Sequence, residues 1–354
     1  MKGFFLKILG IVLAIHVVVI GFLWFRSETE SSKLEDFDDI TSVQALVPLA
    51  EVEALPPVEP TGSNTSTTAS NPMRAAAAQQ RNTLYPLDSN QGVGLDKIAN
   101  PFDDELRSAI LVDANTGKVL FQHDSKKAVP IASMTKMMTA LIAFEEIESN
   151  PELSFDTVVR VSVAASKIGG SQVWLDPRES FTMRELLISI MVKSANDSAY
   201  LVGEYLANGN MKLFVERMNT RALELHMSST TFYNAHGLTS NLLNNRASCE
   251  DLVYLGNELL KHEKAVEWSA MPQYTFRPNA KQPTELRNHN KLVITCPGVD
   301  GLKTGYTKDA GFCVTASCQR DGRRLIAVVT GFLSEKRRNQ FTSNLFDWGY
   351  TQID

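Results

Sequence analysis

The chain has 354 residues, of which 44% are hydrophobic and 21% are charged, so it holds enough apolar material for a sizeable buried core. Its formal net charge is -5 and its basic residues are scattered. This excludes a nucleic-acid partner, because phosphate neutralisation needs a clustered basic face.

The N-terminus carries a basic start followed by a long apolar run. Lys2 and Lys7 precede residues 8–25, which hold no formal charge. A run of about 18 residues is about 27 Å of helix, close to the hydrocarbon thickness of a bilayer. Bulky side chains close this run, at the positions that a signal peptidase reads. Residues 1–27 are therefore predicted to be an uncleaved transmembrane signal anchor, with the rest of the chain outside the cytoplasmic membrane.

Residues 28–95 are rich in Ser, Thr, Ala, Pro, Glu and Asn. Such a composition cannot bury enough apolar surface to offset the entropy of ordering the chain. This segment is predicted to be a flexible linker between the membrane and a folded domain, which spans residues 96–354.

The folded domain begins with strand signals, continues with helical periodicity and returns to strand signals. The predicted strands span residues 108–113, 118–122, 311–317 and 324–330, and the predicted helices span residues 133–147, 183–191, 195–207, 211–225, 249–262 and 335–348. This order predicts an α+β fold in which both ends of the domain form one sheet and a helical lobe is inserted between them. A cleft is expected where the sheet and the lobe meet.

The cysteines of this domain are Cys249, Cys296, Cys313 and Cys318. Cys313 and Cys318 lie on one predicted strand at an odd spacing, so their side chains point to opposite faces and cannot pair there. No Cys-x-x-Cys pattern indicates zinc, and buried or free thiols are expected. The sequence predicts neither a metal nor a cofactor.

Ser133-Met134-Thr135-Lys136 is the only Ser-x-x-Lys sequence in the chain. At positions i and i+3 of a helix, a hydroxyl and an amine lie on one face and can meet. A serine hydroxyl is a weak nucleophile until a base takes its proton, and lysine can be that base once burial or a neighbouring cation lowers its pKa. The alternative is an ordinary helix start with Ser133 near the N-cap.

Ser194-Ala195-Asn196 offers a second hydroxyl and an amide. The hydroxyl can relay a proton between the lysine and a leaving group, and the amide can hold both the lysine and a substrate carbonyl. A helix N-cap is the alternative, because Ser and Asn favour that position.

Lys303-Thr304-Gly305 offers a cation and a hydroxyl that can hold a carboxylate at a sheet edge. Gly305, which has no side chain, would let a substrate backbone approach closely. A turn is the alternative. The three elements, in this order, form the motif set of class A β-lactamases and penicillin-binding proteins.

On these motifs the chain resembles the low-molecular-mass penicillin-binding proteins, the serine D-alanyl-D-alanine carboxypeptidases, over about residues 101–350. The likeness also rests on Gly169-Gly170-Ser171 with Gln172-Val173-Trp174-Leu175, on Asn234-Ala235-His236-Gly237-Leu238, on residues 299–316 and on Trp348-Gly349-Tyr350. The resemblance implies the penicillin-binding protein and β-lactamase-like fold, a mainly antiparallel sheet flanked by helices with a helical lobe beside it.

The resemblance also implies a role for each matched residue. It makes Ser133 the acylated nucleophile, Lys136 its base and Ser194 the proton shuttle. The implied substrate-binding residues are Asn196, Lys303, Thr304, Gly305, Tyr306 and Arg338. The oxyanion hole would be formed by the backbone N–H groups of Ser133 and Tyr306.

Three of the matched positions leave alternatives open. Arg338 falls where family members carry an arginine for the substrate carboxylate, and a simple surface position is the alternative. His236 and Asp251 match positions near the family's active site. His236 is interpreted as structural rather than as a general base, because the lysine already fills that role.

The function that the resemblance implies is removal of the terminal D-alanine from peptidoglycan stem peptides through an acyl-enzyme. β-Lactam antibiotics would be covalent inhibitors, and the catalytic domain would lie outside the cytoplasmic membrane. Many relatives continue into a β-rich C-terminal domain and an anchoring helix, whereas this chain is expected to use its N-terminal span instead. Relatives without that second domain include D,D-endopeptidases, so cleavage of peptide cross-links is an alternative.

Two further alternatives are a β-lactamase and a non-catalytic β-lactam sensor or wall-binding module. A class A β-lactamase needs a glutamate that activates the deacylating water. Glu204 and Asn208 superficially fit its Glu-x-x-x-Asn pattern, but they follow Ser194 closely, on the same predicted helix, and are interpreted as a coincidence.

Overall fold

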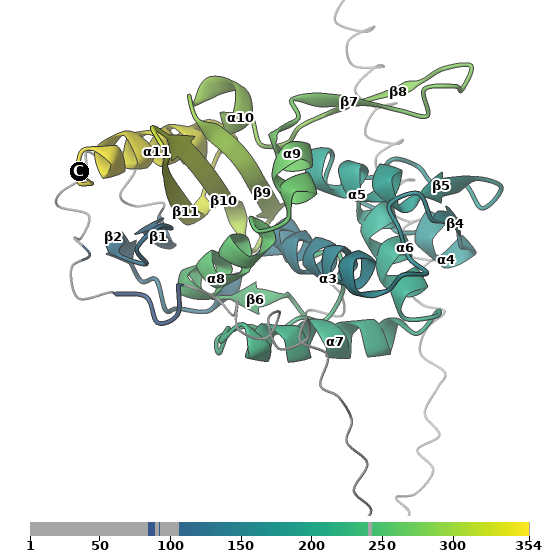
Figure 1. The fold of residues 1–354 in the computed structure, drawn as a ribbon, viewed down its shortest axis with the longest axis horizontal. Coiled ribbons are helices and arrows are strands. Elements are labelled where there is room, and N and C mark those ends of the chain that lie inside the picture. Colours follow the sequence, from purple (N-terminus) through teal and green to yellow (C-terminus); the bar gives the residue numbers. More distant parts are fainter. Residues whose placement is uncertain (1–83, 89–91, 93–105, 240–242, 354) are drawn as a thin grey trace, which may run out of the picture. The chain divides into compact units, whose positions relative to one another are not determined.

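The structure is a computed structural model that describes residues 84–88, 92, 106–239 and 243–353 (Figure 1). The predicted anchor, residues 1–27, and most of the predicted linker lie outside these residues. Among the helices of the described ranges, none is long and apolar enough to cross a membrane.

The main sheet has five strands, and every neighbouring pair is antiparallel. The strands are β1 (Ser108–Asp113), β2 (Val119–His123), β9 (Val299–Thr307), β10 (Gly311–Arg320) and β11 (Arg323–Phe332), in the order β2-β1-β11-β10-β9. β1 comes from the start of the domain and pairs with β11 from its end, with Ser108 opposite Thr330. The prediction of one sheet made from both ends of the domain is therefore confirmed.

The helical lobe lies between β2 and β9 in the chain, as predicted. The helices between these strands are α3 (Lys136–Ser149), α4 (Val163–Ser166), α5 (Met183–Val192), α6 (Asn196–Leu206), α7 (Met211–Glu224), α8 (Cys249–Leu259), α9 (Glu263–Ala270) and α10 (Leu292–Thr295), preceded by the 3₁₀ turn η2 (Ala132–Thr135). A last helix, α11 (Glu335–Tyr350), follows β11. The start of α5 has a local cause. Thr182 and Glu185 form a capping box, in which each side chain accepts a backbone N–H of the other residue.

Several short elements were not predicted, because they are brief and partly exposed and give little periodic signal. They are the strand pairs β3 (Val129–Pro130) with β6 (Arg246–Ala247), β4 (Val158–Arg160) with β5 (Ser180–Thr182), and β7 (Gln273–Phe276) with β8 (Thr284–Arg287). The helices α4, α9 and α10 were also missed. Of these, the β7–β8 hairpin matters most, because it ends beside the candidate site.

The two faces of the main sheet are buried by different helices (Figure 1). Phe341, Leu345 and Phe346 of α11 cover one face, and α8 covers the other. Cys313 packs in the core on the α8 side and Cys318 in the core on the α11 side, as the odd spacing predicts. All four cysteines are free thiols.

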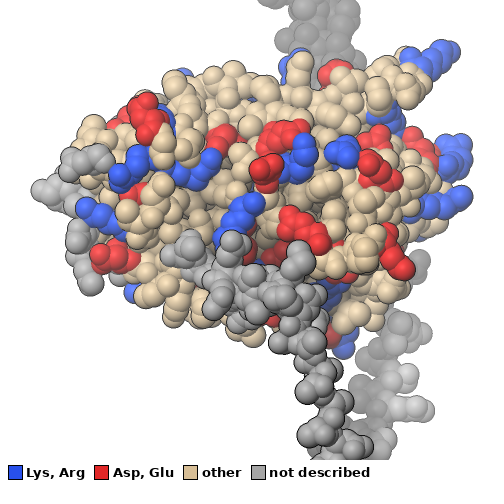
Figure 2. All heavy atoms as spheres, in the orientation of Figure 1, with Lys and Arg blue, Asp and Glu red and all other residues tan. Residues whose placement is uncertain are grey.

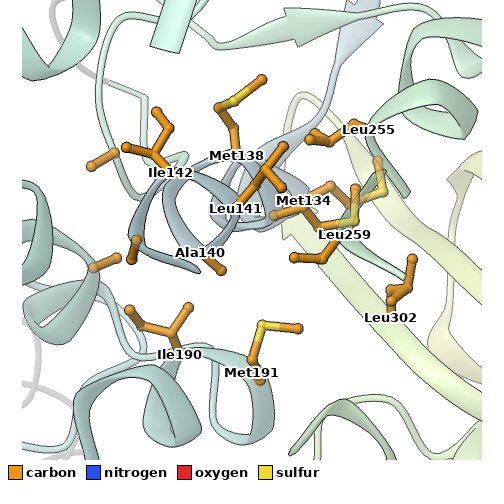
Figure 3. Packing of buried hydrophobic residues seen from close by; sticks show 14 of the residues in the cluster. Met134, Met138, Ala140, Leu141, Ile142, Ile190, Met191, Leu255, Leu259 and Leu302 are labelled. Carbon is orange, nitrogen blue, oxygen red and sulfur yellow. The ribbon is translucent and has the colours of Figure 1, made fainter. Parts of the chain in front are cut away.

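Helix α3 lies in the core between the helical lobe and the sheet. In Figure 3, Ala140 of this helix faces Ile190 and Met191 of α5, while Met138 extends from the opposite side of the helix. Leu255 and Leu259 of α8 and Leu302 of β9 belong to the same core. Every residue from Lys136 to Phe144 is buried, because this stretch is apolar around almost its whole circumference. The start of α3 is thereby held at the junction of the two parts.

Residues 84–88 fall within the predicted linker, residues 28–95, but in the structure they pack against the folded domain. Leu84 is buried in the core, and the ring of Tyr85 stacks on His226 with 3.9 Å between centroids. The packed part of the chain therefore begins earlier than predicted, because a few apolar side chains follow the polar stretch.

The surface of the helical lobe carries cross-helix ion pairs. Arg221 of α7 pairs with Glu145 of α3 at 2.6 Å and with Glu258 of α8 at 3.4 Å. Arg217 of α7 pairs with Glu146 of α3 at 2.6 Å. On the face of the molecule shown in Figure 2, acidic and basic side chains are interspersed in the same way.

Candidate active site

Most of the predicted site residues line one cavity of about 540 Å³. The cavity lies among η2, the loop between α5 and α6, strand β9 and helix α11. The predicted residues in its lining are Ser133, Ser194, Asn196, Thr304, Gly305, Tyr306 and Arg338. Lys136 and Lys303 are buried behind the lining, with 0% and 1% of their surface exposed.

Ser133 lies in η2, one turn before Lys136. Its Oγ accepts a hydrogen bond from Lys136 Nζ at 3.0 Å, which is the contact that the i, i+3 spacing predicts. The N-cap of η2 is Ile131 and the N-cap of α3 is Thr135, and neither makes a side-chain cap bond. The alternative reading of Ser133 as a helix cap is therefore wrong.

Lys136 has two further acceptors in the domain. Its Nζ donates to Asn196 Oδ1 at 2.6 Å and to the carbonyl oxygen of His236 at 2.5 Å. Burial lowers the pKa of Lys136 well below its usual range, and the charge of Lys303 lowers it further, while Asp197 opposes them. A neutral amine has two N–H donors and one lone pair. In the neutral form of Lys136, the two N–H groups can bind Asn196 Oδ1 and the His236 carbonyl oxygen. The lone pair of Nζ then faces Ser133 Oγ.

Ser194 lies in the loop between α5 and α6 with φ at 61°, a left-handed conformation that serine rarely adopts. Its buried Oγ has no hydrogen-bond partner among the described residues, which is a cost that a native structure usually avoids. The N-cap of α6 is Ala195, which makes no side-chain cap bond, so the helix-cap reading of Ser194 is wrong.

Asn196 is held in place by the Gly169-Gly170-Ser171 segment. Its Nδ2 donates to the carbonyl oxygen of Gly169 at 2.7 Å, and its backbone N–H donates to Ser171 O at 2.7 Å. Gly170 has φ at 80°, and a Cβ there would lie 2.6 Å from Asn196 Nδ2. Glycine is required here because the amide packs directly on the backbone.

Lys303 lies on β9, where the alternative reading of a turn is wrong. Its Nζ donates to the neighbouring carbonyl oxygen of Thr304 at 3.2 Å. Burial lowers the pKa of Lys303 to about 7, and the charge of Arg338 contributes to this shift. Its ammonium group lies behind the cavity, while the side chain of Thr304 lines it.

Gly305 is required for a reason that the sequence did not predict. A Cβ on this residue would lie 2.7 Å from the carbonyl oxygen of Ile131, so β9 and the turn that carries Ser133 touch through their backbones. Gly237 packs on the same turn, since a Cβ there would lie 2.0 Å from Ala132 O. Two glycines therefore hold the turn from two sides.

Arg338 is only 2% exposed, so the alternative reading of a surface position is wrong. Its guanidinium donates to the carbonyl oxygen of Cys313 at 3.1 Å and to Asn339 Oδ1 at 2.6 Å. Burial lowers the pKa of Arg338 to about 10, which leaves it charged at neutral pH. It presents a positive charge to the cavity.

The structure separates His236 from Asp251. Burial and the charge of Lys136 lower the pKa of His236 to about 3, and its Nδ1 accepts from the backbone N–H of Leu238 at 3.2 Å. The ring is thus neutral at physiological pH, in keeping with the structural interpretation. Asp251 accepts hydrogen bonds from Ser229 and Thr230 and lines another cavity, so its expected place near the site is wrong.

Several residues of the lining were not predicted from the sequence, and most of them precede β9 in the chain. The missed residues include Lys193, Arg287, Asn288, His289, Lys291 and Glu335. The polar segment Asn288-His289-Asn290, shortly before Lys303 in the chain, is the sequence feature that could have indicated this part of the cavity lining. It belongs to no periodic element, so pattern analysis passed over it.

Comparison with known proteins relates the chain to one family. The family model described as D-alanyl-D-alanine carboxypeptidase, peptidase S11, matches residues 96–333. The chain is 36% identical over 250 residues to D-alanyl-D-alanine carboxypeptidase DacF of Bacillus subtilis, a match that covers 71% of this chain and 63% of that protein. It is 30% identical to DacD of Escherichia coli, over 75% of this chain and 69% of the relative.

Solved structures show the same fold. Penicillin-binding protein 6B of Escherichia coli matches with a TM-score of 0.64 and 31% identity, over 70% of this chain and 77% of that chain. Penicillin-binding protein D2 of Listeria monocytogenes, solved with ampicillin bound, matches with a TM-score of 0.62 and 29% identity, over 69% of this chain and 97% of that chain. The predicted fold class is confirmed.

Proposed function

The chain belongs to the peptidase S11 family, and on that premise we propose that it is a serine D-alanyl-D-alanine carboxypeptidase acting on peptidoglycan stem peptides. The observation that carries this proposal is the set of contacts around Lys136. A buried amine with a lowered pKa and two fixed acceptors meets the hydroxyl of Ser133. That arrangement is suited to a lysine acting as a general base.

In the proposed acylation, neutral Lys136 takes the proton of Ser133, and Oγ attacks the carbonyl carbon of the penultimate D-alanine. The backbone N–H groups of Ser133 and Tyr306 would hold the oxyanion. The C–N bond to the terminal D-alanine breaks, and the leaving amine receives the proton from Lys136 through Ser194. Ser194 Oγ has no hydrogen-bond partner among the described residues, so it is open to a hydrogen bond from the substrate. Water then hydrolyses the ester of Ser133, with the neutral amine of Lys136 again acting as the base.

The free carboxylate of the terminal D-alanine would be held by Thr304 and Arg338. Both side chains line the cavity, and the guanidinium is charged. Charge-assisted hydrogen bonds are the stronger kind, and a cross-linked peptide has an amide instead of this carboxylate. The positive lining therefore favours carboxypeptidase over endopeptidase activity.

The lining does not favour a β-lactamase. Glu204 lies on α6 and lines a different cavity, together with Glu146 and Arg160. Among the described residues, the only carboxylate in the lining of the Ser133 cavity is Glu335, which is paired with Lys291 at 2.8 Å. Apart from the paired Glu335, no glutamate of the described residues lines this cavity, and β-lactams are expected to inhibit the enzyme as persistent acyl-enzymes.

The test is D-alanine release from a pentapeptide ending in D-Ala-D-Ala, together with labelling by a tagged penicillin. Wild type should do both, and Ser133→Ala should do neither. Labelling that persists in Ser133→Ala would overturn the assignment of the nucleophile. Labelling without D-alanine release would indicate a sensor, and rapid hydrolysis of penicillin a β-lactamase. Faster cleavage of cross-linked dimers than of pentapeptides would establish the endopeptidase alternative.

We also propose that residues 1–27 anchor the enzyme in the cytoplasmic membrane with its catalytic domain outside. The apolar run of residues 8–25 and the lysines before it support this orientation. The full-length chain should fractionate with membranes, and a chain lacking residues 1–27 should not. A mature N-terminus shortly after Phe25 would show instead that the segment is a cleaved signal.

A further inference from the structure

The Ser133 cavity has cations in its lining that the proposed mechanism does not use. Lys193 follows the end of α5, Arg287 ends β8, and Lys291 precedes α10. They come from elements other than the ones that carry Thr304 and Arg338, the residues assigned to the terminal carboxylate. The lining therefore holds positive charge beyond what one carboxylate requires.

These cations differ in whether they already have an ion-pair or hydrogen-bond partner within the protein. Lys291 makes an ion pair with Glu335 at 2.8 Å. No group in the described part of the chain accepts a hydrogen bond or an ion pair from Lys193 Nζ or from the guanidinium of Arg287. Lys193 contributes only its backbone to the fold, since its carbonyl oxygen accepts from Ser171 Oγ at 2.8 Å. Its ammonium group and the guanidinium of Arg287 remain available to a ligand.

A histidine in the lining, His289, shows how strongly positive this region is. Burial lowers the pKa of His289 to about 3, and the charges of Lys303, Lys193, Lys136 and Arg338 all act in the same direction. The imidazole is therefore neutral at physiological pH and adds no charge of its own. The region is cationic through its lysines and arginines, and an anion there would meet no fixed repulsion apart from the paired Glu335.

The rest of the lining includes apolar surface. Tyr306 stands 57% exposed, and its ring packs on Phe312 with 4.2 Å between centroids. Leu238 also lines the cavity. An occupant that carries hydrocarbon as well as a negative charge fits this combination better than a free inorganic anion, because each part finds a complementary surface.

We propose that Lys193 and Arg287 form a second anion subsite, which binds a carboxylate carried by the stem peptide on the residue before D-Ala-D-Ala. This inference rests on the proposed function, since it takes the cavity to hold a peptide ending in D-Ala-D-Ala. It means that the enzyme selects peptides whose preceding residue bears a free carboxylate over peptides in which that group is an amide. The pairs formed would be partly exposed, so the discrimination is moderate.

The experiment uses the full chain and two pentapeptides that are identical except for a carboxylate or a carboxamide on the residue before D-Ala-D-Ala. Wild type should prefer the carboxylate in kcat/KM by about threefold to tenfold, which is what two partly exposed ion pairs can supply. Added salt should reduce the preference, because it screens such pairs. In the double variant Lys193→Gln with Arg287→Gln, the ratio should fall towards one.

Lys291→Gln is the matched control, because it removes a cation of the same lining that already has a partner, and it should keep the preference. Labelling with tagged penicillin shows that each variant is folded. If wild type releases D-alanine equally fast from both peptides, or if the double variant keeps the full preference, the second subsite is refuted while the proposed function stands. If neither peptide yields D-alanine, the proposed function itself fails.

Discussion

The cations of the active site and those of the helical lobe are held in opposite ways. Lys136, Lys303 and Arg338 are at most 2% exposed, and their hydrogen bonds go to carbonyl, amide and hydroxyl oxygens. Arg221 and Arg217 of α7 are 22% and 35% exposed, and both pair with glutamates at 2.6 Å. One set is buried and hydrogen-bonded to neutral groups, with one longer ion pair between Arg338 and Glu335 at 3.8 Å, and the other is near solvent with close carboxylate partners.

The difference indicates what each set contributes. A buried charge without a close counter-ion is costly, and its pKa moves towards the neutral form. This cost is what makes Lys136 available as a base at moderate pH. The pairs of the lobe join opposite charges near solvent and add little stability, because water screens them. The buried cations of the site therefore lower the stability of the fold and raise the reactivity of Lys136. The ion pairs of the lobe have little effect on either.

The largest effect is expected at Lys136. Lys136→Ala should lower penicillin acylation by about 10²–10⁴-fold, the usual contribution of a general base. Lys136→Arg is the sharper variant, since it keeps the positive charge but cannot lose its proton near neutral pH. In wild type, acylation should rise as the pH rises through the lowered pKa of Lys136, because only the neutral amine accepts a proton. Acylation of Lys136→Arg at the wild-type rate would contradict the role of base.

Lys303→Met should stabilise the fold at low pH. The folded pKa of Lys303 is about 7, against 10.5 for a free side chain. Between these values the unfolded chain binds the proton and the folded chain does not, so wild-type stability rises with pH across this window. The variant should therefore gain roughly 3–5 kcal/mol below pH 7 and lose that advantage by about pH 10.

Thermal unfolding at several pH values would measure this gain, with the exposed Lys308→Met as control. The same variant should shift the pH profile of acylation upwards, because the charge of Lys303 helps to lower the pKa of Lys136. If Lys303→Met is less stable than wild type at pH 6, burial of the Lys303 charge does not destabilise the fold.

Arg338→Ala should lower kcat/KM for a free-carboxylate pentapeptide by about 10-fold to 100-fold, the equivalent of one charged hydrogen bond. Penicillin acylation should fall in the same direction, because penicillin carries an equivalent carboxylate. Arg337→Ala, which changes the exposed neighbour on α11, is the control and should have little effect. Equal losses in both variants would point to a general effect of charge or of folding on α11.

The smallest effect is expected for the ion pair of Arg217 with Glu146. A double-mutant cycle with Arg217→Ala and Glu146→Ala, followed by denaturant unfolding, should give a coupling energy of about 0.2–1 kcal/mol that falls with added salt. A coupling energy well above this range would show that the ion pairs of the lobe contribute substantially to stability, contrary to the difference between the lobe and the site.

The sequence alone determined the parts of the molecule that depend on local spacing. Strand and helix patterns located both halves of the sheet and the lobe between them, and the spacing of Ser133 and Lys136 predicted their contact at 3.0 Å. The odd spacing of Cys313 and Cys318 placed them on opposite faces. These features follow from the periods of strand and helix, which the chain carries in its residue order.

Only the tertiary structure decided the chemistry around those residues. The two other acceptors of Lys136 lie 60 and 100 residues away in the chain, on α6 and at His236, and the cation that helps to lower its pKa lies on β9. Gly305 is required by a contact with the Ile131 carbonyl, and Arg287 reaches the cavity on a hairpin that gave no clear pattern. Burial and charge depend on which distant segments meet, and no local period records that.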